Sequence, residues 1–229
     1  MVLKGLQKLT LLDFPGKMAA TVFTGGCNFR CPFCHNGSLV IPERFGETLP
    51  EEEFFAFLNK RRGILEGVCV SGGEPTLYPD VADFIKRIRS LGFLVKLDTN
   101  GSQPSRLKGL IDEGLLDYVA MDIKSSKEGY SRAVGMENFD LSDIEKSVEI
   151  LKEGKVDFEF RTTVVKQLHS EADFEEIGKW LQGDFKLFLQ TFIDSGDLIG
   201  SGYSAYGEEE MKSFVEILKK YMPNATLRG

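Results

Sequence analysis

Short runs of apolar and β-branched residues alternate along the chain with longer segments in which apolar residues recur every three or four positions. The short runs are typical of buried strands, and the longer period is typical of amphipathic helices. Residues 80–91 show the helical spacing clearly, because Val81, Phe84, Ile85 and Ile88 fall on one face. We therefore predict a helix over this segment.

The predicted strands and helices come in turn along the sequence. Strands are expected at residues 18–23, 67–71, 93–98, 117–123, 156–165 and 185–192. Helices are expected from Pro50 onward, where three glutamates suit the positive end of the helix dipole, and at residues 80–91, 104–113, 141–153, 172–181 and 208–221. Six strand–helix units in series predict an α/β fold with a parallel sheet. Because 229 residues are few for eight units, we expect an open partial (β/α)6 barrel, built as a single domain over residues 1–229.

The charge balance and the apolar runs limit the classes of partner. The chain has 28 basic and 35 acidic residues, a net charge of -7, which argues against a broad nucleic-acid surface. No segment approaches the roughly 18 apolar residues that a membrane helix needs. Residues 1–12 lack the pattern of a signal peptide. We therefore expect a cytoplasmic protein that binds neither nucleic acid nor membrane.

Polar or glycine-rich segments follow the predicted strands at the same relative place in successive units. They are residues 27–34, residues 72–75, residues 98–101, the pair Asp122 and Lys124, and Arg161 within the fifth strand. The carboxyl ends of parallel strands meet at one edge of the sheet, where active sites of βα proteins gather. This placement predicts one functional site.

Three of the four cysteines, Cys27, Cys31 and Cys34, lie within eight positions. In a cytosolic protein such crowding favours metal or redox chemistry. Three thiolates can hold three corners of an iron–sulfur cube and leave one iron open for a substrate. A structural zinc site is the weaker alternative, since it needs a fourth nearby ligand. His35 would have to fold back sharply to serve, and Cys69 lies in an apolar strand, where we interpret it as a core residue.

The spacing Cys-x-x-x-Cys-x-x-Cys, with Phe33 before the last cysteine and a strand before the loop, resembles the radical S-adenosylmethionine superfamily. Further segments are similar to those of glycyl-radical-enzyme activating proteins, in particular of the kind that acts on anaerobic ribonucleoside-triphosphate reductase. These segments are residues 13–17, 26–36, 98–101 and 121–124, and residues 72–75 are similar to the glycine-rich segment of the superfamily as a whole. The resemblance therefore covers most of the chain.

The resemblance implies an oxidoreductase with a barrel of the radical S-adenosylmethionine type, a [4Fe-4S] cluster on the three cysteines and S-adenosylmethionine as second cofactor. One electron from a flavodoxin- or ferredoxin-type donor would break a carbon–sulfur bond and give a 5'-deoxyadenosyl radical. That radical would take a hydrogen atom from a glycine of a partner enzyme, expected to be anaerobic ribonucleotide reductase. Two alternatives stay open. One is a member that acts on a small molecule, of the deazapurine-precursor type, and the other is a non-catalytic iron–sulfur protein.

The resemblance also implies roles for residues that bind S-adenosylmethionine. Gly72 and Gly73 would line its methionine part, with Glu74 nearby, and Asn100 belongs to the segment that ends the third strand. Asp98, Thr99, Asp122 and the carbonyl of residue 120 or 121 would form the site of a monovalent cation. Glycine at 72 and 73 permits close approach of the backbone to a ligand.

Two basic residues each have a functional and a structural interpretation. Lys124 would pair with the methionyl carboxylate, or it is an exposed strand-end lysine. Arg161 would contact the ribose or carboxylate of the ligand, or it forms an ion pair with Glu159. His169 is expected to be exposed to solvent. Residues 194–207, with four glycines, are expected to form a surface loop, with a mobile lid or docking loop as the alternative.

Overall fold

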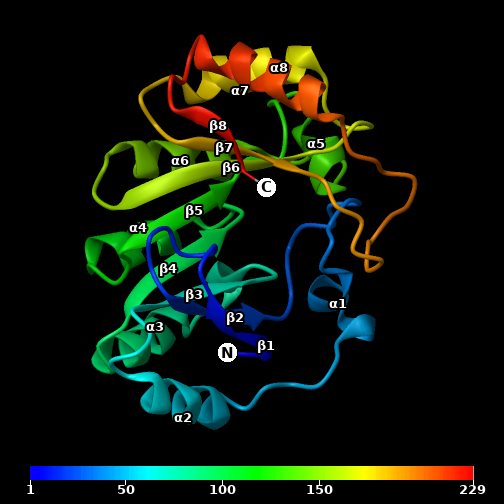
Figure 1. The fold of residues 1–229 in the computed structure, drawn as a ribbon. Coiled ribbons are helices and arrows are strands. Elements are labelled where there is room, and N and C mark those ends of the chain that lie inside the picture. The colour runs from blue at the N-terminus through cyan, green and yellow to red at the C-terminus, as the bar shows by residue number, and fades with distance from the viewer. Residues whose placement is uncertain (229) are drawn as a thin grey trace.

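The computed structural model describes residues 1–228, and its centre is one eight-stranded sheet. The strands follow the chain order β1 to β8. β1 is antiparallel to β2, and every other neighbouring pair is parallel. The strands are Leu3–Thr10, Ala19–Thr24, Gly67–Gly72, Leu94–Thr99, Tyr118–Asp122, Asp157–Val164, Leu187–Thr191 and Ala225–Arg228. β1 and β8 are the two edges, so the curved sheet is an open barrel (Figure 1).

Helices follow the parallel strands and cover the outer face of the sheet (Figure 1). The longer ones are α2 (Glu51–Arg61), α3 (Val81–Ser90), α4 (Pro104–Asp112), α6 (Ser142–Lys152), α7 (Glu171–Leu181) and α8 (Glu208–Lys219). Short helices α1 (Gly37–Val40) and α5 (Tyr130–Val134) and two 3-10 turns, Pro42–Arg44 and Pro75–Leu77, complete the set. The six units from β2 to α8 confirm the predicted α/β partial barrel, to which β1 and β8 are added at the edges. No helix among residues 1–228 is long and apolar enough to span a bilayer.

The outer face of the sheet and the inner faces of the helices form the main core. In α3 the four residues with helical spacing, Val81, Phe84, Ile85 and Ile88, are all buried as predicted. Burial of each such side chain contributes about 1.5–3 kcal/mol relative to exposure. This packing fixes the strands that carry the polar residues at their carboxyl ends.

The inside of the barrel is closed at the amino ends of the strands by an aromatic plug. Phe14, from the connection between β1 and β2, packs against Ala19 and Tyr118. A Cβ atom at Gly67 would lie 2.8 Å from the Phe14 ring, so glycine is needed there to admit the ring. The polar interior above this plug therefore faces the carboxyl ends of the strands.

Candidate active site

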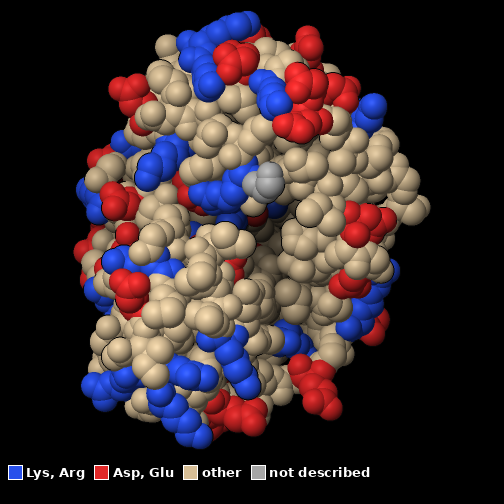
Figure 2. Space-filling model, viewed as in Figure 1, with Lys and Arg blue, Asp and Glu red and all other residues tan. Residues whose placement is uncertain are grey.

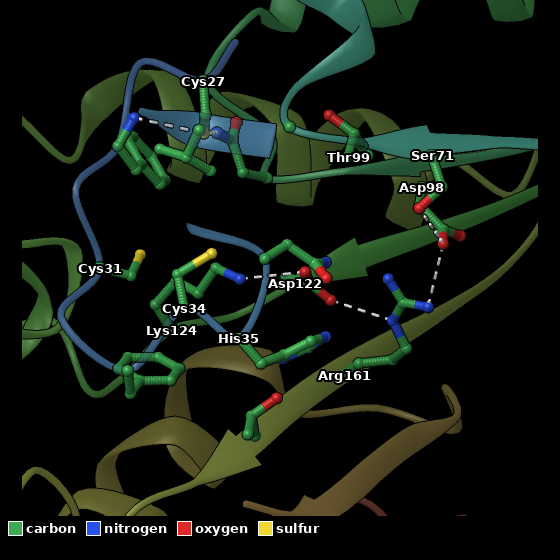
Figure 3. Close-up of a pocket in the computed structure, with 18 of the residues that line it drawn as sticks. Cys27, Cys31, Cys34, His35, Ser71, Asp98, Thr99, Asp122, Lys124 and Arg161 are labelled. Carbon is green, nitrogen blue, oxygen red and sulfur yellow. Dashed lines mark hydrogen bonds and ion pairs between the residues drawn. The ribbon is translucent and has the colours of Figure 1, made fainter. Parts of the chain in front are cut away.

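A cavity of about 270 Å³ lies inside the barrel at the carboxyl ends of the strands. It is lined by eleven of the predicted site residues: Cys27, Cys31, Cys34, Gly72, Gly73, Asp98, Thr99, Asn100, Asp122, Lys124 and Arg161. Figure 3 shows the cysteines on one side of this space and Asp98 and Arg161 on the opposite side. Figure 2 shows that the molecular surface is hollowed near the middle of this face and that few charged side chains border the hollow.

The cysteine loop is held by bonds from its own backbone and from neighbouring elements. The Cys34 N–H donates to the Cys31 carbonyl over 3.0 Å, and the Arg30 N–H donates to the carbonyl of Val134 in α5 over 2.9 Å. Cys31 is buried and Cys27 and Cys34 are half-buried, and all three line the cavity. The loop therefore presents all three thiols from a fixed backbone.

The chemistry of these thiols fits an iron–sulfur cluster. Burial raises the pKa of Cys27 to about 11 and that of Cys31 to about 12, so the thiols stay protonated until a metal displaces the protons. Among residues 1–228 no three His, Cys, Asp or Glu side chains meet closely enough to hold a single ion. A [4Fe-4S] cube offers a separate iron at each corner, so its ligands need not converge on one point.

The glycine pair after β3 is required by close backbone contacts. Gly72 has φ +120, and a Cβ on it would lie 2.3 Å from the Thr24 nitrogen. A Cβ on Gly73 would lie 1.9 Å from the Gly26 carbonyl oxygen, at the start of the cysteine loop. The segment therefore packs directly on the backbone that leads into the cysteine loop.

Glu74 lies behind the cavity wall and does not line the cavity. It is fully buried and accepts hydrogen bonds from the Asn100 N–H at 2.6 Å, the Thr99 hydroxyl at 2.8 Å and the Thr76 N–H at 3.0 Å. Burial raises the pKa of Glu74, and these donors act in the opposite direction. The carboxylate thus fastens the segment after β4 to the segment after β3, which sequence reasoning did not anticipate.

The opposite wall is a chain of charges that ends at the cysteine loop. Arg161 Nε lies 2.9 Å from Asp122 Oδ1, and its Nη1 lies 3.4 Å from Asp98 Oδ2. Lys124 Nζ lies 3.0 Å from Asp122 Oδ2, and the buried Lys96 pairs with Asp98. Burial alone would raise the pKa of both carboxyls. The positive charges of Arg161 and Lys96 hold the pKa of Asp98 below its usual range. Those of Arg161 and Lys124 do the same for Asp122.

The structure corrects the structural interpretations of both basic residues. Arg161 pairs with aspartates, not with Glu159, which instead accepts from Arg228 Nη2 at 2.7 Å and from the Tyr118 hydroxyl at 2.9 Å. The side chains of Arg161 and Glu159 both point into the barrel. Glu159 is nearer the amino end of β6, so its neighbours are Tyr118 and Arg228 and not the aspartates. Lys124 is not an exposed strand-end residue, because it lines the cavity and pairs with Asp122.

The expectation for His169 is wrong, because its side chain is buried with 3% exposure. Its Nδ1 accepts from the Val165 N–H at 2.9 Å, and its Nε2 lies 2.8 Å from the Lys124 carbonyl oxygen. Since Nδ1 accepts, Nε2 carries the proton and donates to Lys124. Burial lowers the pKa of this imidazole, which keeps it neutral. His169 therefore fixes the backbone at Lys124. Its neighbours in the sequence are mostly polar, so the hydrophobic pattern did not indicate that this side chain is buried.

Asp13 and Ser71 also line the cavity, although neither was among the predicted site residues. Asp13, from the connection between β1 and β2, lines the cavity and accepts from Thr21 over 2.5 Å. Ser71 at the end of β3 donates to Asp98 Oδ2 over 2.9 Å. Asp13 lies within the segment 13–17 and Ser71 directly precedes Gly72, so nearness to motif residues was the available signal.

The family model described as Radical SAM superfamily matches residues 21–181. A Methanocaldococcus jannaschii protein assigned as a glycyl-radical enzyme activating enzyme is 32% identical, over 99% of this chain and 95% of that protein. The pyruvate formate-lyase-activating enzyme of Clostridium pasteurianum is 29% identical, over 64% of this chain and 61% of that enzyme.

A solved structure with a similar fold is that of Streptococcus suis SuiB bound to S-adenosylmethionine. Its TM-score is 0.70 at 15% identity, over 90% of this chain and 49% of that one. Residues 21–181, which the family model matches, include the cysteine loop and the ends of strands β2 to β6 that line the cavity. The chain therefore belongs to the radical S-adenosylmethionine superfamily.

Proposed function

We propose that this protein cleaves S-adenosylmethionine reductively and installs a glycyl radical on a partner enzyme, namely anaerobic ribonucleotide reductase. The observation that carries the proposal is the joint geometry of the cavity, in which three thiols of one loop face a paired Asp98–Arg161–Asp122–Lys124 chain. Such a site offers soft ligands on one side and fixed charges for a zwitterionic ligand on the other.

The superfamily implies a [4Fe-4S] cluster and S-adenosylmethionine, and Cys27, Cys31 and Cys34 are the residues that would hold the cluster. When bound and reduced, the cluster supplies the electron that splits S-adenosylmethionine into methionine and a 5'-deoxyadenosyl radical. The chain's own work is to orient that ligand and to keep water and quenching groups away. No side chain needs to move a proton in this reaction.

The cavity walls offer partners for each polar part of S-adenosylmethionine. We assign the backbone of Gly72 and Gly73 to the methionyl amino group, since both glycines line the cavity beside the cysteine loop. Lys124 lines the cavity and its charge is coupled to Cys31 and Cys34, so it suits the methionyl carboxylate of a ligand beside the cysteine loop. Thr99 and Asn100, held by Glu74, offer hydrogen bonds to the remaining polar atoms.

Arg161 already supplies positive charge between Asp98 and Asp122. A monovalent cation at Asp98, Thr99 and Asp122 would therefore bind only if Arg161 moved away from these carboxylates. An anomalous-scattering map of crystals grown with a heavier alkali ion tests this part of the proposal. Density between the two aspartates would support the cation, and none there would remove it.

The open side of the barrel supports a protein partner. The edge strands β1 and β8 are not paired with each other, so an extended loop of a large protein could reach the cavity between them. Every proposed site residue lies on a strand of the one sheet or on the loop that follows a strand, and we propose that residues 1–229 act as a single domain. A flavodoxin- or ferredoxin-type donor would reduce the cluster.

The decisive experiment is anaerobic reconstitution followed by incubation with reductant, S-adenosylmethionine and candidate partners. A glycyl doublet in the electron-paramagnetic-resonance spectrum of anaerobic ribonucleotide reductase would support the proposal. Turnover of a purine-type small molecule without any glycyl signal would favour the deazapurine-precursor alternative. Failure to form 5'-deoxyadenosine under strong reductant would favour a non-catalytic iron–sulfur protein.

A further inference from the structure

The glycine-rich connection between β7 and α8 folds over the cysteine loop. Figure 1 shows this segment, in orange, running beside α1. The Gly200 N–H donates to the carbonyl of Pro32, between Cys31 and Cys34, over 2.7 Å. The Ser195 hydroxyl donates to the carbonyl of His35 over 2.7 Å. Residues 195–200 therefore hold the backbone on either side of Cys34, and we call them the strap.

Asp197 makes two of the hydrogen bonds between the strap and the residues that follow the cysteine loop. Its carbonyl accepts from the Gly37 N–H at 2.9 Å, and its carboxylate Oδ2 accepts from the Ser38 N–H at 2.7 Å. A Cβ on Gly37 would lie 2.6 Å from the Asp197 carbonyl oxygen, so the two backbones touch. One residue of the strap thus binds two successive amides just after the last cysteine.

The carboxylate of Asp197 also acts on Cys34 through its charge. Burial is the main cause that raises the pKa of Cys34, and the negative charge of Asp197 adds to it. The nearest cation to Asp197 is Arg44, whose Nη1 lies 3.9 Å away and also donates to the Leu198 carbonyl. Negative charge near a cluster disfavours its reduced form, because reduction adds further negative charge.

We propose that Asp197 is a positioning residue of the cluster site, which retains the cluster by fixing the backbone after Cys34 and lowers the reduction potential of the cluster by its charge. The strap belongs to the last strand–helix unit, and the cysteine loop belongs to the first. The strap therefore joins the two ends of the open barrel at the cluster. This inference rests on the superfamily chemistry alone and is independent of the partner enzyme.

Two substitutions separate the roles of backbone support and charge. Asp197→Ala removes both the acceptor for the Ser38 N–H and the charge. Asp197→Asn removes the charge but keeps an amide oxygen that can accept the same bond. Asp194→Ala is the matched control, because the Asp194 carboxylate accepts from the Gly196 N–H, which makes none of the strap's bonds to the cysteine loop.

The three variants and the unchanged protein are reconstituted without oxygen, and iron per chain is measured. Iron release to a chelator is followed by the loss of cluster absorbance, and the reduction potential is measured by electron-paramagnetic-resonance titration. We expect Asp197→Ala to release iron about tenfold faster, the size typical of outer ligand support. Asp197→Asn should release iron at nearly the original rate but show a more positive potential, and Asp194→Ala should match the unchanged protein in both.

Circular dichroism and thermal melting of the cluster-free proteins check that the variants fold. Equal release rates for Asp197→Ala and Asp194→Ala would overturn the positioning role, and an unshifted potential in Asp197→Asn would overturn the charge role. The failure of the glycyl-radical assay would leave both measurements valid, since neither uses a partner protein.

Discussion

The two walls of the cavity differ in how much of their chemistry the folded chain supplies by itself. The wall with Asp98, Asp122 and Arg161 is charged and internally paired. The wall with Cys27 and Cys31 carries thiols whose pKa values are raised by burial, so it stays neutral until a metal binds. The difference teaches that the charged wall is part of the folded structure, whereas the cysteine wall is completed only by its cofactor.

The strongest way to test this contrast is to remove one thiol. Cys31→Ser should lower 5'-deoxyadenosine formation by more than about 100-fold, since even outer support of a metal site is worth up to that factor. The melting temperature of the cluster-free protein should fall by less than after the loss of a buried ion pair, because burying the serine hydroxyl in place of the core thiol costs about 1–3 kcal/mol. Iron content, product chromatography and thermal melting measure the three quantities.

Cys69→Ala is the matched control for this substitution. Cys69 is fully buried in β3 and belongs to the core, as the sequence predicted. Its loss should leave iron content unchanged. Equal iron loss in Cys31→Ser and Cys69→Ala would contradict the division between the two walls.

The charged wall should respond in the opposite way. Arg161→Met leaves Asp98 and Asp122 without their shared guanidinium, and breaking a buried pair costs about 3–5 kcal/mol. Urea unfolding of the cluster-free protein measures this cost. Lys108→Ala, which breaks an exposed pair with Asp112 in α4, should cost less than about 1 kcal/mol. A similar cost for both variants would mean that the charged wall does not stabilise the fold.

Local patterns in the sequence predicted most of the fold and most of the cavity lining. Each of the twelve predicted strands and helices is present within a few residues, because hydrophobic period and helix-start signals are local. The site residues were found because they are chemically distinctive and follow strands. β1 was missed because Lys4, Gly5, Gln7 and Lys8 interrupt any apolar pattern, and its strand state depends on pairing with β2.

Partners that lie far apart in the sequence could not be predicted. The pairing of Arg161 with Asp122 spans 39 residues, and the contact of His169 with Lys124 spans 45. The strap contacts span about the whole barrel, since Asp197 binds Ser38 across 159 residues. Alternation along β6 places Arg161 and Glu159 on the same face of the strand, but it does not indicate which neighbours each of them meets inside the barrel.

A smaller effect is expected at His169, which supports the charged wall from behind. His169→Phe keeps a ring in the site but leaves the Lys124 carbonyl and the Val165 N–H without their partner. An unsatisfied buried group costs about 1–3 kcal/mol, measured by urea unfolding. Glu128→Ala, at an exposed position four residues after Lys124, should change the unfolding free energy by less than about 0.5 kcal/mol. If the two variants are alike, His169 does not fix the Lys124 backbone.

The smallest expected effects are changes in the slope of unfolding free energy against pH. The charged wall should determine the slope at acid pH, and the cysteine wall should determine the slope at alkaline pH. Asp98 and Asp122 have folded pKa values below the unfolded value of about 3.9, so the unfolded chain binds more protons below that value. Their stabilising contribution is present above pH of about 4 and is lost as the pH falls through the folded values. Each group contributes at most about 1.4 kcal/mol per pH unit.

The cysteine wall has the opposite sign. Cys27 and Cys31 have folded pKa values of about 11 and about 12, against about 8.5 in the unfolded chain, so here the folded chain binds more protons. Their contribution is present below pH of about 8.5 and is lost as the pH rises toward 12. Urea unfolding of the cluster-free, reduced protein across both ranges should show Arg161→Met flattening only the acid limb and Cys31→Ser flattening only the alkaline limb. A variant that flattened the other wall's limb would show that the two walls titrate as one unit, because only coupled charges transmit a proton change across the cavity.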